Sequence, residues 1–378
     1  MRISETWTFS AQSGVKVILQ IPRSLKLTIA ASQIIWLGSC ANLPYYAQAV
    51  DGQMDILRRA QPISTIIADP DTDQKLKRVL ARVVLMREFA SRELKLPDNQ
   101  SYTSYADLKR PYAVWNVFAA HELSTELKKW CFVKAGCVSY RGFFSQADAE
   151  SYAEELKNEG YDVYVGGVRA YSTLGWFNDP VLNTFIGYSE MELARLIFHE
   201  LTHQVVYVPS DSAFNESFAT VVEKEGVGRW LDSTGATSQR AVFDARQERE
   251  AIFIELVLNH RKRLEELFTS NLNDAEKRVA KARIFDELRE EFSQLKTTRA
   301  EFSSYDRWFA QQLNNALLAT ISTYTQLVPA FQVLLAQQNG DMSQFFAAVK
   351  EISKLPETER AAVLQIAVES RRRDIAER

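Results

Sequence analysis

Residues 199–203 read His199-Glu200-Leu201-Thr202-His203, and this stretch constrains the fold more than any other in the chain. Histidine is scarce, with four in 378 residues, so this spacing seldom arises by chance. Helix positions four apart share a face, so His199 and His203 can hold one Zn²⁺ through two imidazoles. Glu200 occupies the next helix position after His199, beside the metal, where a general base for a zinc-bound water is expected. The surrounding apolar residues recur at the spacing of an amphipathic helix: Leu193, Leu196, Ile197, Leu201 and Val205.

A catalytic zinc needs a third protein ligand and an open position for water. Glu216 is the favoured ligand, because residues 205–212 form a break rich in helix N-cap residues and a second helix begins after it. That helix can pack antiparallel to the first. Glu223 lies on the same face and is expected to accept a hydrogen bond from a liganding imidazole, and we give Asn215 a supporting role as well. The alternatives for the third ligand are Asp211, Glu223 and His260.

A second stretch imitates the metal motif. It reads His121-Glu122-Leu123-Ser124-Thr125, with Thr125 where the second histidine must be. We therefore exclude it as a metal site.

The residues around Glu216 read Asn215-Glu216-Ser217-Phe218-Ala219, and Gln204 follows His203. Both strings resemble gluzincin metallopeptidases, including the aminopeptidases that carry HExxHQ and NExFA. Gluzincins usually have a longer insert than the twelve residues found here between His203 and Glu216, which implies a trimmed zincin core. Nearly all of the chain also resembles the bacterial predicted aminopeptidase family of lipoproteins, in strings such as Arg58-Arg59-Ala60-Gln61-Pro62, Trp130-Cys131-Phe132, Gly136-Cys137-Val138, Tyr140-Arg141-Gly142 and Leu313-Asn314-Asn315-Ala316.

The resemblance implies further site residues. In zincins a tyrosine or histidine steadies the oxyanion, and among Tyr171, Tyr188, Tyr207 and Tyr324 we favour Tyr324 and Tyr171 as catalytic residues. Zincins also bind the substrate backbone on an edge strand just upstream of the metal helix. Residues 169–180 are placed for this strand, and the alternative is a loop with core aromatics. Its expected substrate-binding residues are Gly175, Trp176 and Asp179, the only acid there that could hold a free amine.

The first forty residues predict an exported, lipid-anchored protein. The apolar run 27–37 follows Arg23 and Lys26 and is too short to span a bilayer, as in a signal peptide. Leu37-Gly38-Ser39-Cys40 resembles the bacterial lipobox, so residues 1–39 are the predicted signal peptide and Cys40 the lipidated residue. Ala41 resembles an outer-membrane sorting signal, which implies anchoring on the periplasmic side. The alternative is a buried helix with a chance cysteine.

The rest of the sequence predicts a mainly α fold with a small α+β subdomain around a zincin-like, gluzincin-type core. Residues 40–109 form an N-terminal helical segment, in which 72–94 have a helical period. Residues 110–186 form the α+β subdomain with the substrate strand, in which 114–119 are a predicted strand. Residues 187–378 form the zinc-binding and C-terminal helical region. No apolar run after Cys40 is expected to span a membrane. Cys131 and Cys137 flank a turn and either pair across a hairpin or stay as two thiols.

These features predict a zinc-dependent peptidase, by resemblance an aminopeptidase, with one Zn²⁺ per chain and Glu200 as the base that activates a zinc-bound water. One alternative is a non-catalytic envelope lipoprotein with a structural zinc, closed by Asp211 or Glu223. Another is a zinc amidase acting on cell-wall cross-links. The net charge of −3 argues against a nucleic-acid partner. The sequence leaves exo- or endo-cleavage and the oligomeric state open.

Overall fold

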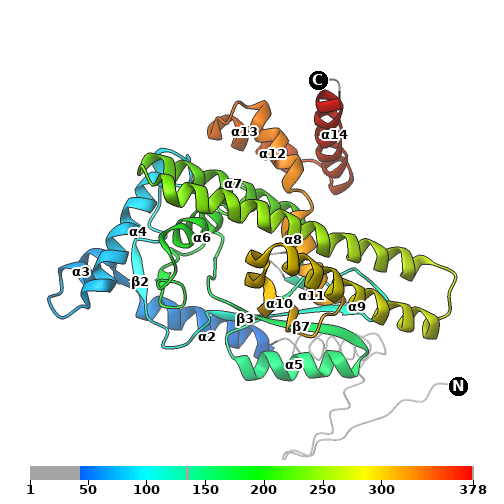
Figure 1. Ribbon diagram of the computed structural model, residues 1–378. Helices are drawn as coiled ribbons and strands as arrows, with labels where there is room; N and C mark the ends of the chain where they lie inside the picture. Colours follow the sequence, from blue (N-terminus) through cyan, green and yellow to red (C-terminus); the bar gives the residue numbers. More distant parts are fainter. Residues whose placement is uncertain (1–42, 133–135, 377–378) are drawn as a thin grey trace, which may run out of the picture. The chain divides into compact units, whose positions relative to one another are not determined.

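The computed structural model describes residues 43–132 and 136–376 (Figure 1). The chain divides into two units, residues 1–54 and 55–378. In the first unit only the beginning of helix α2 (Leu43–Arg59) is described. The predicted signal peptide, its lipobox and Cys40 therefore lie outside the described residues.

The described part is mainly helical with small sheets, as predicted. The segments 40–109, 110–186 and 187–378 stay predictions as domains. After α2 the helices are α3 (Ile63–Ala68), α4 (Gln74–Arg92), α5 (Gln146–Asn158), α6 (Glu190–Thr202), α7 (Ser212–Ser233), α8 (Thr237–Thr269), α9 (Asp274–Thr298), the 3₁₀ helix η1 (Ala300–Tyr305), α10 (Asp306–Phe309), α11 (Asn315–Thr325), α12 (Val328–Gln337), α13 (Met342–Ser353) and α14 (Glu357–Ala376). The strands are β1 (Gln61–Pro62), β2 (Ser104–Ala106), β3 (Val114–His121), β4 (Trp130–Phe132), β5 (Gly136–Val138), β6 (Arg141–Phe143), β7 (Tyr161–Val168) and β8 (Val181–Leu182).

Strand β3 is the centre of the main sheet, which has the order β6–β3–β7 with antiparallel pairing on both sides. Every residue of β3 except its last is buried, because α5 and α11 both pack against the strand. The side chain of Ser145 caps α5 by accepting a hydrogen bond from the backbone N–H of Asp148. This sheet and α5 make up the predicted α+β region.

Strands β4 and β5 form a separate hairpin in which Cys131 lies opposite Cys137, and a disulfide joins the two. Of the two alternatives for these cysteines, the structure has the pair. Gly136 begins β5 at φ +72°, and a Cβ there would lie 2.6 Å from Ser210 Oγ. The backbone N–H of Cys137 donates to the same oxygen over 2.9 Å. The hairpin therefore packs against the loop that joins α6 to α7.

The third sheet has the order β1–β2–β8, and β8 pairs parallel with β2. No residue of 169–180 belongs to a strand, so the predicted substrate strand is instead a loop that ends at the short, buried β8. Leu174 and Gly175 explain the difference, since both have positive φ, 56° and 82°, which a strand cannot accommodate.

The largest core cluster lies around α4, α6 and α7. Gly226 lets α7 approach its neighbours, because a Cβ there would lie 2.7 Å from both Phe198 Cδ2 and Leu94 Cδ1. Phe198 of α6 and Phe214 and Phe218 of α7 are fully buried. This close packing fixes the two helices that carry the predicted metal ligands.

Residues Asn315–Gln337 are long and apolar enough to cross a membrane by length and composition, whereas no run after Cys40 was expected to do so. The stretch is two helices in the structure, α11 and α12. Both pack against α7, and most of α11 contributes to buried core. Their apolar composition is therefore accounted for by packing within the protein.

Candidate metal centre

Two helix ends set the position of the predicted ligands. His199 lies in the last turn of α6, and His203 is the C-terminal cap of that helix. Glu216 lies in the first turns of α7, which begins after Asp211. Asp211 Oδ1 accepts a hydrogen bond from the backbone N–H of Phe214 over 3.0 Å, as an N-cap does. The end of one helix thus meets the start of the next.

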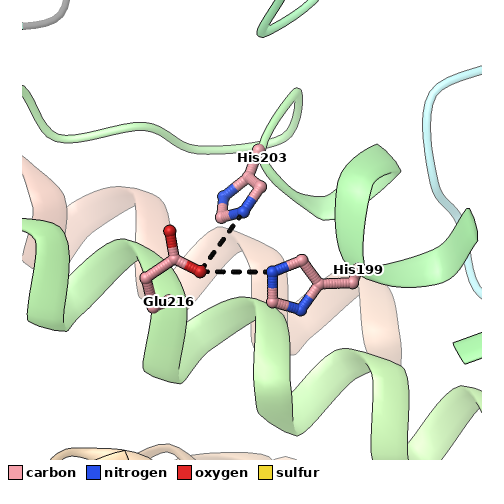
Figure 2. Close-up of side chains that lie close together, drawn as sticks. All are labelled: His199, His203 and Glu216. Carbon is pink, nitrogen blue, oxygen red and sulfur yellow. Dashed lines mark hydrogen bonds and ion pairs between the residues drawn. The ribbon is translucent and has the colours of Figure 1, made fainter. Parts of the chain in front are cut away.

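Figure 2 shows the side chains of His199, His203 and Glu216 converging on one point. Glu216 Oε2 lies 3.2 Å from His199 Nε2 and 3.7 Å from His203 Nε2. The three donor atoms lie within 4.8 Å of one another, and no other such group forms among the described side chains of residues 44–132 and 136–366. Ligand atoms at roughly 2.0–2.2 Å from a tetrahedral zinc lie about 3.3–3.6 Å apart, close to the two separations of Glu216 Oε2 from the imidazole nitrogens, so these residues suit that ion.

His199 is held by a chain of charged groups. Its Nδ1 lies 2.8 Å from Glu223 Oε2, the contact expected of Glu223, which leaves Nε2 to face Glu216. Arg195 Nη1 lies 3.2 Å from the other oxygen of Glu223, and Arg195 Nε lies 3.4 Å from Glu192. Burial raises the pKa of Glu223, but Arg195 and His199 outweigh it and hold that pKa below its usual value. Glu223 therefore stays ionised and fixes the orientation of the His199 ring.

His203 is buried, with 7 % of its surface exposed. Burial lowers the pKa of its imidazole to about 4, so the ring is neutral at pH 7. A neutral imidazole is the form that binds a metal. Its Nδ1 is buried and has no hydrogen-bond partner in the described part of the chain.

Glu200 lies beside the donor atoms without being one of them. Its carboxylate makes no hydrogen bond or ion pair to the described side chains of residues 44–132 and 136–366. Burial raises its pKa to about 7, a shift that His199 opposes and Glu216 strengthens. A carboxylate with this pKa and no fixed partner is suited to taking up and releasing a proton at neutral pH.

A model of the family described as "Putative aminopeptidase" matches residues 44–364. The chain belongs to this aminopeptidase family. The resemblance found in the sequence is confirmed at that level, while the gluzincin likeness and the lipid anchor stay predictions. No curated protein and no solved structure matches the chain.

Two tyrosines of this aminopeptidase-family chain lie near the donor atoms. The ring of Tyr324, on α11, stacks near that of His199 with centroids 6.5 Å apart. The charge of Glu216, followed by burial, raises the pKa of Tyr324 well above its usual value. Tyr140, between β5 and β6, feels the same carboxylate, and burial and then Glu216 raise its pKa. Both hydroxyls therefore stay protonated and can donate hydrogen bonds.

Tyr140 was not among the tyrosines singled out from the sequence. It follows a hairpin strand and its ring packs on Phe118, with centroids 5.7 Å apart, so nothing local relates it to α6 or α7. The string Tyr140-Arg141-Gly142, which carries part of the family resemblance, was the available signal. The ring centroid of Tyr171 lies 5.3 Å from that of Phe144, and burial and then Asp179 raise the pKa of Tyr171.

The predicted substrate-binding residues Gly175, Trp176 and Asp179 share one loop. Asp179 is almost fully buried, and its carboxylate accepts hydrogen bonds from Thr173, 3.0 Å from the backbone N and 2.8 Å from Oγ1. The Asp179 carboxylate therefore hydrogen-bonds within its own loop. The sequence had led us to expect that it would bind a substrate amine. Gly175 packs toward Gln204, the residue after His203.

The supporting residue Asn215 and the alternative ligands Asp211 and His260 have other partners in this chain. Asn215 exchanges two hydrogen bonds of 2.8 Å with the backbone of Val208, so it clamps the loop between the ligands. Asp211 forms an ion pair with Arg360, 2.6 Å apart, in addition to capping α7. His260 is buried on α8, with Nδ1 2.9 Å from a backbone carbonyl of its own helix. None of these three side chains belongs to the converging donor group.

The imitation motif lies elsewhere. His121 ends β3 and stacks on Tyr161, with ring centroids 4.2 Å apart. Glu122 pairs with Arg278 at the surface. These residues offer matched controls for His199 and Glu200.

Proposed function

We propose that the protein is a zinc-dependent peptidase that hydrolyses peptide bonds as an aminopeptidase. The observation that carries the proposal is the convergence of His199, His203 and Glu216, with the unpaired carboxylate of Glu200 beside them. Two imidazoles and one carboxylate are a donor set of catalytic zinc sites, which keep one position open. Membership of the aminopeptidase family supports the choice of reaction.

Zinc held by these residues would supply a Lewis acid for the scissile carbonyl and lower the pKa of a bound water to about 7. Glu200 takes up a proton from the attacking water and passes it to the leaving amine. The Tyr324 hydroxyl, kept protonated next to His199, donates a hydrogen bond to the developing oxyanion. Glu223 and Arg195 hold His199 in place during the reaction.

A structural zinc is the main competing proposal. Such a site would be closed by a fourth protein ligand, for which Asp211 and Glu223 are the sequence candidates. Asp211 binds Arg360 and the start of α7, and Glu223 binds His199 Nδ1 and Arg195. Both carboxylates are already committed, which favours the open, catalytic arrangement. A zinc amidase for cell-wall cross-links would use the same residues and differs only in substrate.

A free-amine peptide and its N-acetylated twin test the aminopeptidase assignment. Recognition of a substrate ammonium by a charge-assisted hydrogen bond predicts a loss of about 10- to 150-fold in kcat/KM on acetylation. Asp179→Asn is expected to leave this ratio unchanged, because the Asp179 carboxylate already holds Thr173. Equal rates for the two peptides would make the enzyme an endopeptidase, and cleavage of cross-linked cell-wall peptides alone would make it the amidase.

We further propose that the protein is anchored through lipid on Cys40 in the bacterial cell envelope, at the outer membrane facing the periplasm. The Cys131–Cys137 disulfide supports an oxidising compartment. Wild type is expected to fractionate with membranes and to take up a fatty-acid label, and Cys40→Ala to do neither. Labelling that persists in Cys40→Ala would refute the assignment of the anchor.

A further inference from the structure

The two histidines of the donor group are held in different ways. His199 lies within α6, and its Nδ1 contacts Glu223 Oε2 over 2.8 Å. His203 follows the last residue of α6, Thr202, and its buried Nδ1 has no hydrogen-bond partner in the part of the chain that the structure describes. A metal-binding histidine usually donates its second N–H to a partner that orients the ring. The orientation of His203 therefore depends on how the surrounding chain is held.

Gln204, the residue after His203, is fastened to a segment that lies far away in the sequence. Gln204 Oε1 accepts a hydrogen bond from Asn99 Nδ2 over 2.7 Å, and Gln204 Nε2 donates one to Ser101 Oγ over 3.3 Å. Its backbone N–H donates to Leu201 O over 3.1 Å, which continues the turn beyond α6. Both partners of the Gln204 amide lie between α4 and β2, 105 and 103 residues earlier in the chain. The side chain of Gln204 thus joins the end of α6 to this distant segment.

One buried arginine holds this segment in shape. Arg87 of α4 is only 5 % exposed, and its guanidinium donates hydrogen bonds to Asn99 O over 3.0 Å and to Ser101 O over 2.9 Å. Asn99 Oδ1 in turn accepts a hydrogen bond of 3.0 Å from the backbone N–H of Ser101, which leaves Nδ2 to face Gln204. A buried charge is costly unless its hydrogen bonds are made, and the rigid fork of donors in arginine suits several carbonyls at once. The support of Gln204 is therefore built into the protein and does not depend on a substrate.

We propose that Gln204 is a positioning residue for His203, and that Asn99 and the buried Arg87 hold Gln204 in place. The proposal rests on the proposed zinc-dependent function and adds a determinant of its zinc affinity, because Gln204 offers no atom to the donor group. Fixing a ligand before the metal binds reduces the conformational freedom that binding removes, so the affinity rises. The competing interpretation is that these three residues only stabilise the contact between α4 and α6.

The test measures two properties of the full chain. One is the zinc affinity, determined by competition with a chelator, and the other is the visible absorption of the Co²⁺-loaded protein, which reports the geometry of the metal ligands. Gln204→Leu removes both amide hydrogen bonds at similar volume. It should weaken zinc binding by about 3- to 30-fold, the range for one to two hydrogen bonds, and should change the Co²⁺ spectrum. Gln204→Glu should retain most of the affinity, because its carboxylate can still accept hydrogen bonds from Asn99 Nδ2 and Ser101 Oγ–H.

Asn99→Ala and Asn183→Ala form a matched pair. Asn99→Ala should weaken zinc binding, and the double variant with Gln204→Leu should bind zinc within about 2-fold of Gln204→Leu alone, because both changes break one contact. Asn183 also joins distant segments, with Oδ1 2.8 Å from Leu108 N and Nδ2 3.1 Å from Arg110 O, but it does not adjoin a ligand in the sequence. Asn183→Ala should leave the zinc affinity within about 2-fold of wild type.

The outcomes separate the positioning role from the proposed function. If wild type binds no zinc, the proposed function fails and the positioning role with it. If wild type binds zinc but Gln204→Leu binds it as tightly, with the same Co²⁺ spectrum, the positioning role is refuted and the zinc site stands. A loss of thermal stability in the metal-free variants without a loss of zinc affinity would make the three residues structural supports only, and also refutes it. Should Gln204→Leu fail to fold, Asn99→Ala is compared with Asn183→Ala, and equal zinc affinities of these two would refute the positioning role.

Discussion

Replacing His199 by alanine is expected to strip zinc from the protein and to abolish peptide hydrolysis. His199 Nε2 is one of three donor atoms, and its Nδ1 contacts Glu223, which in turn pairs with Arg195. The variant removes a ligand and leaves the buried Glu223 without one partner. Removing a residue that only hydrogen-bonds a metal ligand typically costs about 10- to 100-fold in metal affinity. Removing the ligand itself should therefore lower the metal affinity by more than about 100-fold.

Elemental analysis of purified protein lacking residues 1–40 measures this directly. Wild type should hold about one zinc per chain and His199→Ala almost none after dialysis against a weak chelator. His121→Ala is the matched control, since His121 begins the imitation motif and stacks on Tyr161 away from the donors. Full zinc occupancy in His199→Ala would refute the ligand assignment.

The parts of the fold that the sequence predicted well are those that local periodicity determines. Residues 72–94 predicted a helix and α4 spans Gln74–Arg92, with the Asp73 side chain as its cap. Residues 114–119 predicted a strand and β3 spans Val114–His121. The donor group could be predicted for the same reason. Its two signals are both local: the four-residue spacing of His199 and His203, and the helix start before Glu216.

The parts that the sequence did not predict depend on contacts between distant segments. Tyr140 feels the charge of Glu216 because α11 packs against both the main sheet and α7. Arg195 reaches Glu223 only across the α6–α7 contact. The loop before β8 was expected to be a strand, since neither the positive φ of Leu174 nor the closure by Asp179 is visible in the pattern of apolar residues. The loop ends where β8 pairs with β2.

Glu200→Gln is expected to keep the zinc and lose the reaction. Glutamine has nearly the same shape, and Glu200 contributes no atom to the donor group, so metal content should stay at about one per chain. An amide cannot take up a proton at neutral pH, so kcat should fall by about 10²- to 10⁴-fold, the usual contribution of a general base. Because Glu200 has no fixed partner among the described residues, the substitution breaks no hydrogen bond or ion pair there.

Comparing Glu216→Gln with Glu200→Gln distinguishes a metal ligand from a general base. Glu216 Oε2 faces both imidazoles, so this variant should lose metal affinity together with activity. Glu122→Gln is the control for the chemical change, because Glu122 follows His121 as Glu200 follows His199 but pairs with Arg278 at the surface. Zinc content and kcat are measured on all three variants. Glu200→Gln should hold zinc without activity, Glu216→Gln should have neither zinc nor activity, and Glu122→Gln should keep both. If Glu200→Gln and Glu216→Gln behaved alike in both measurements, the separate roles of these two carboxylates would be wrong.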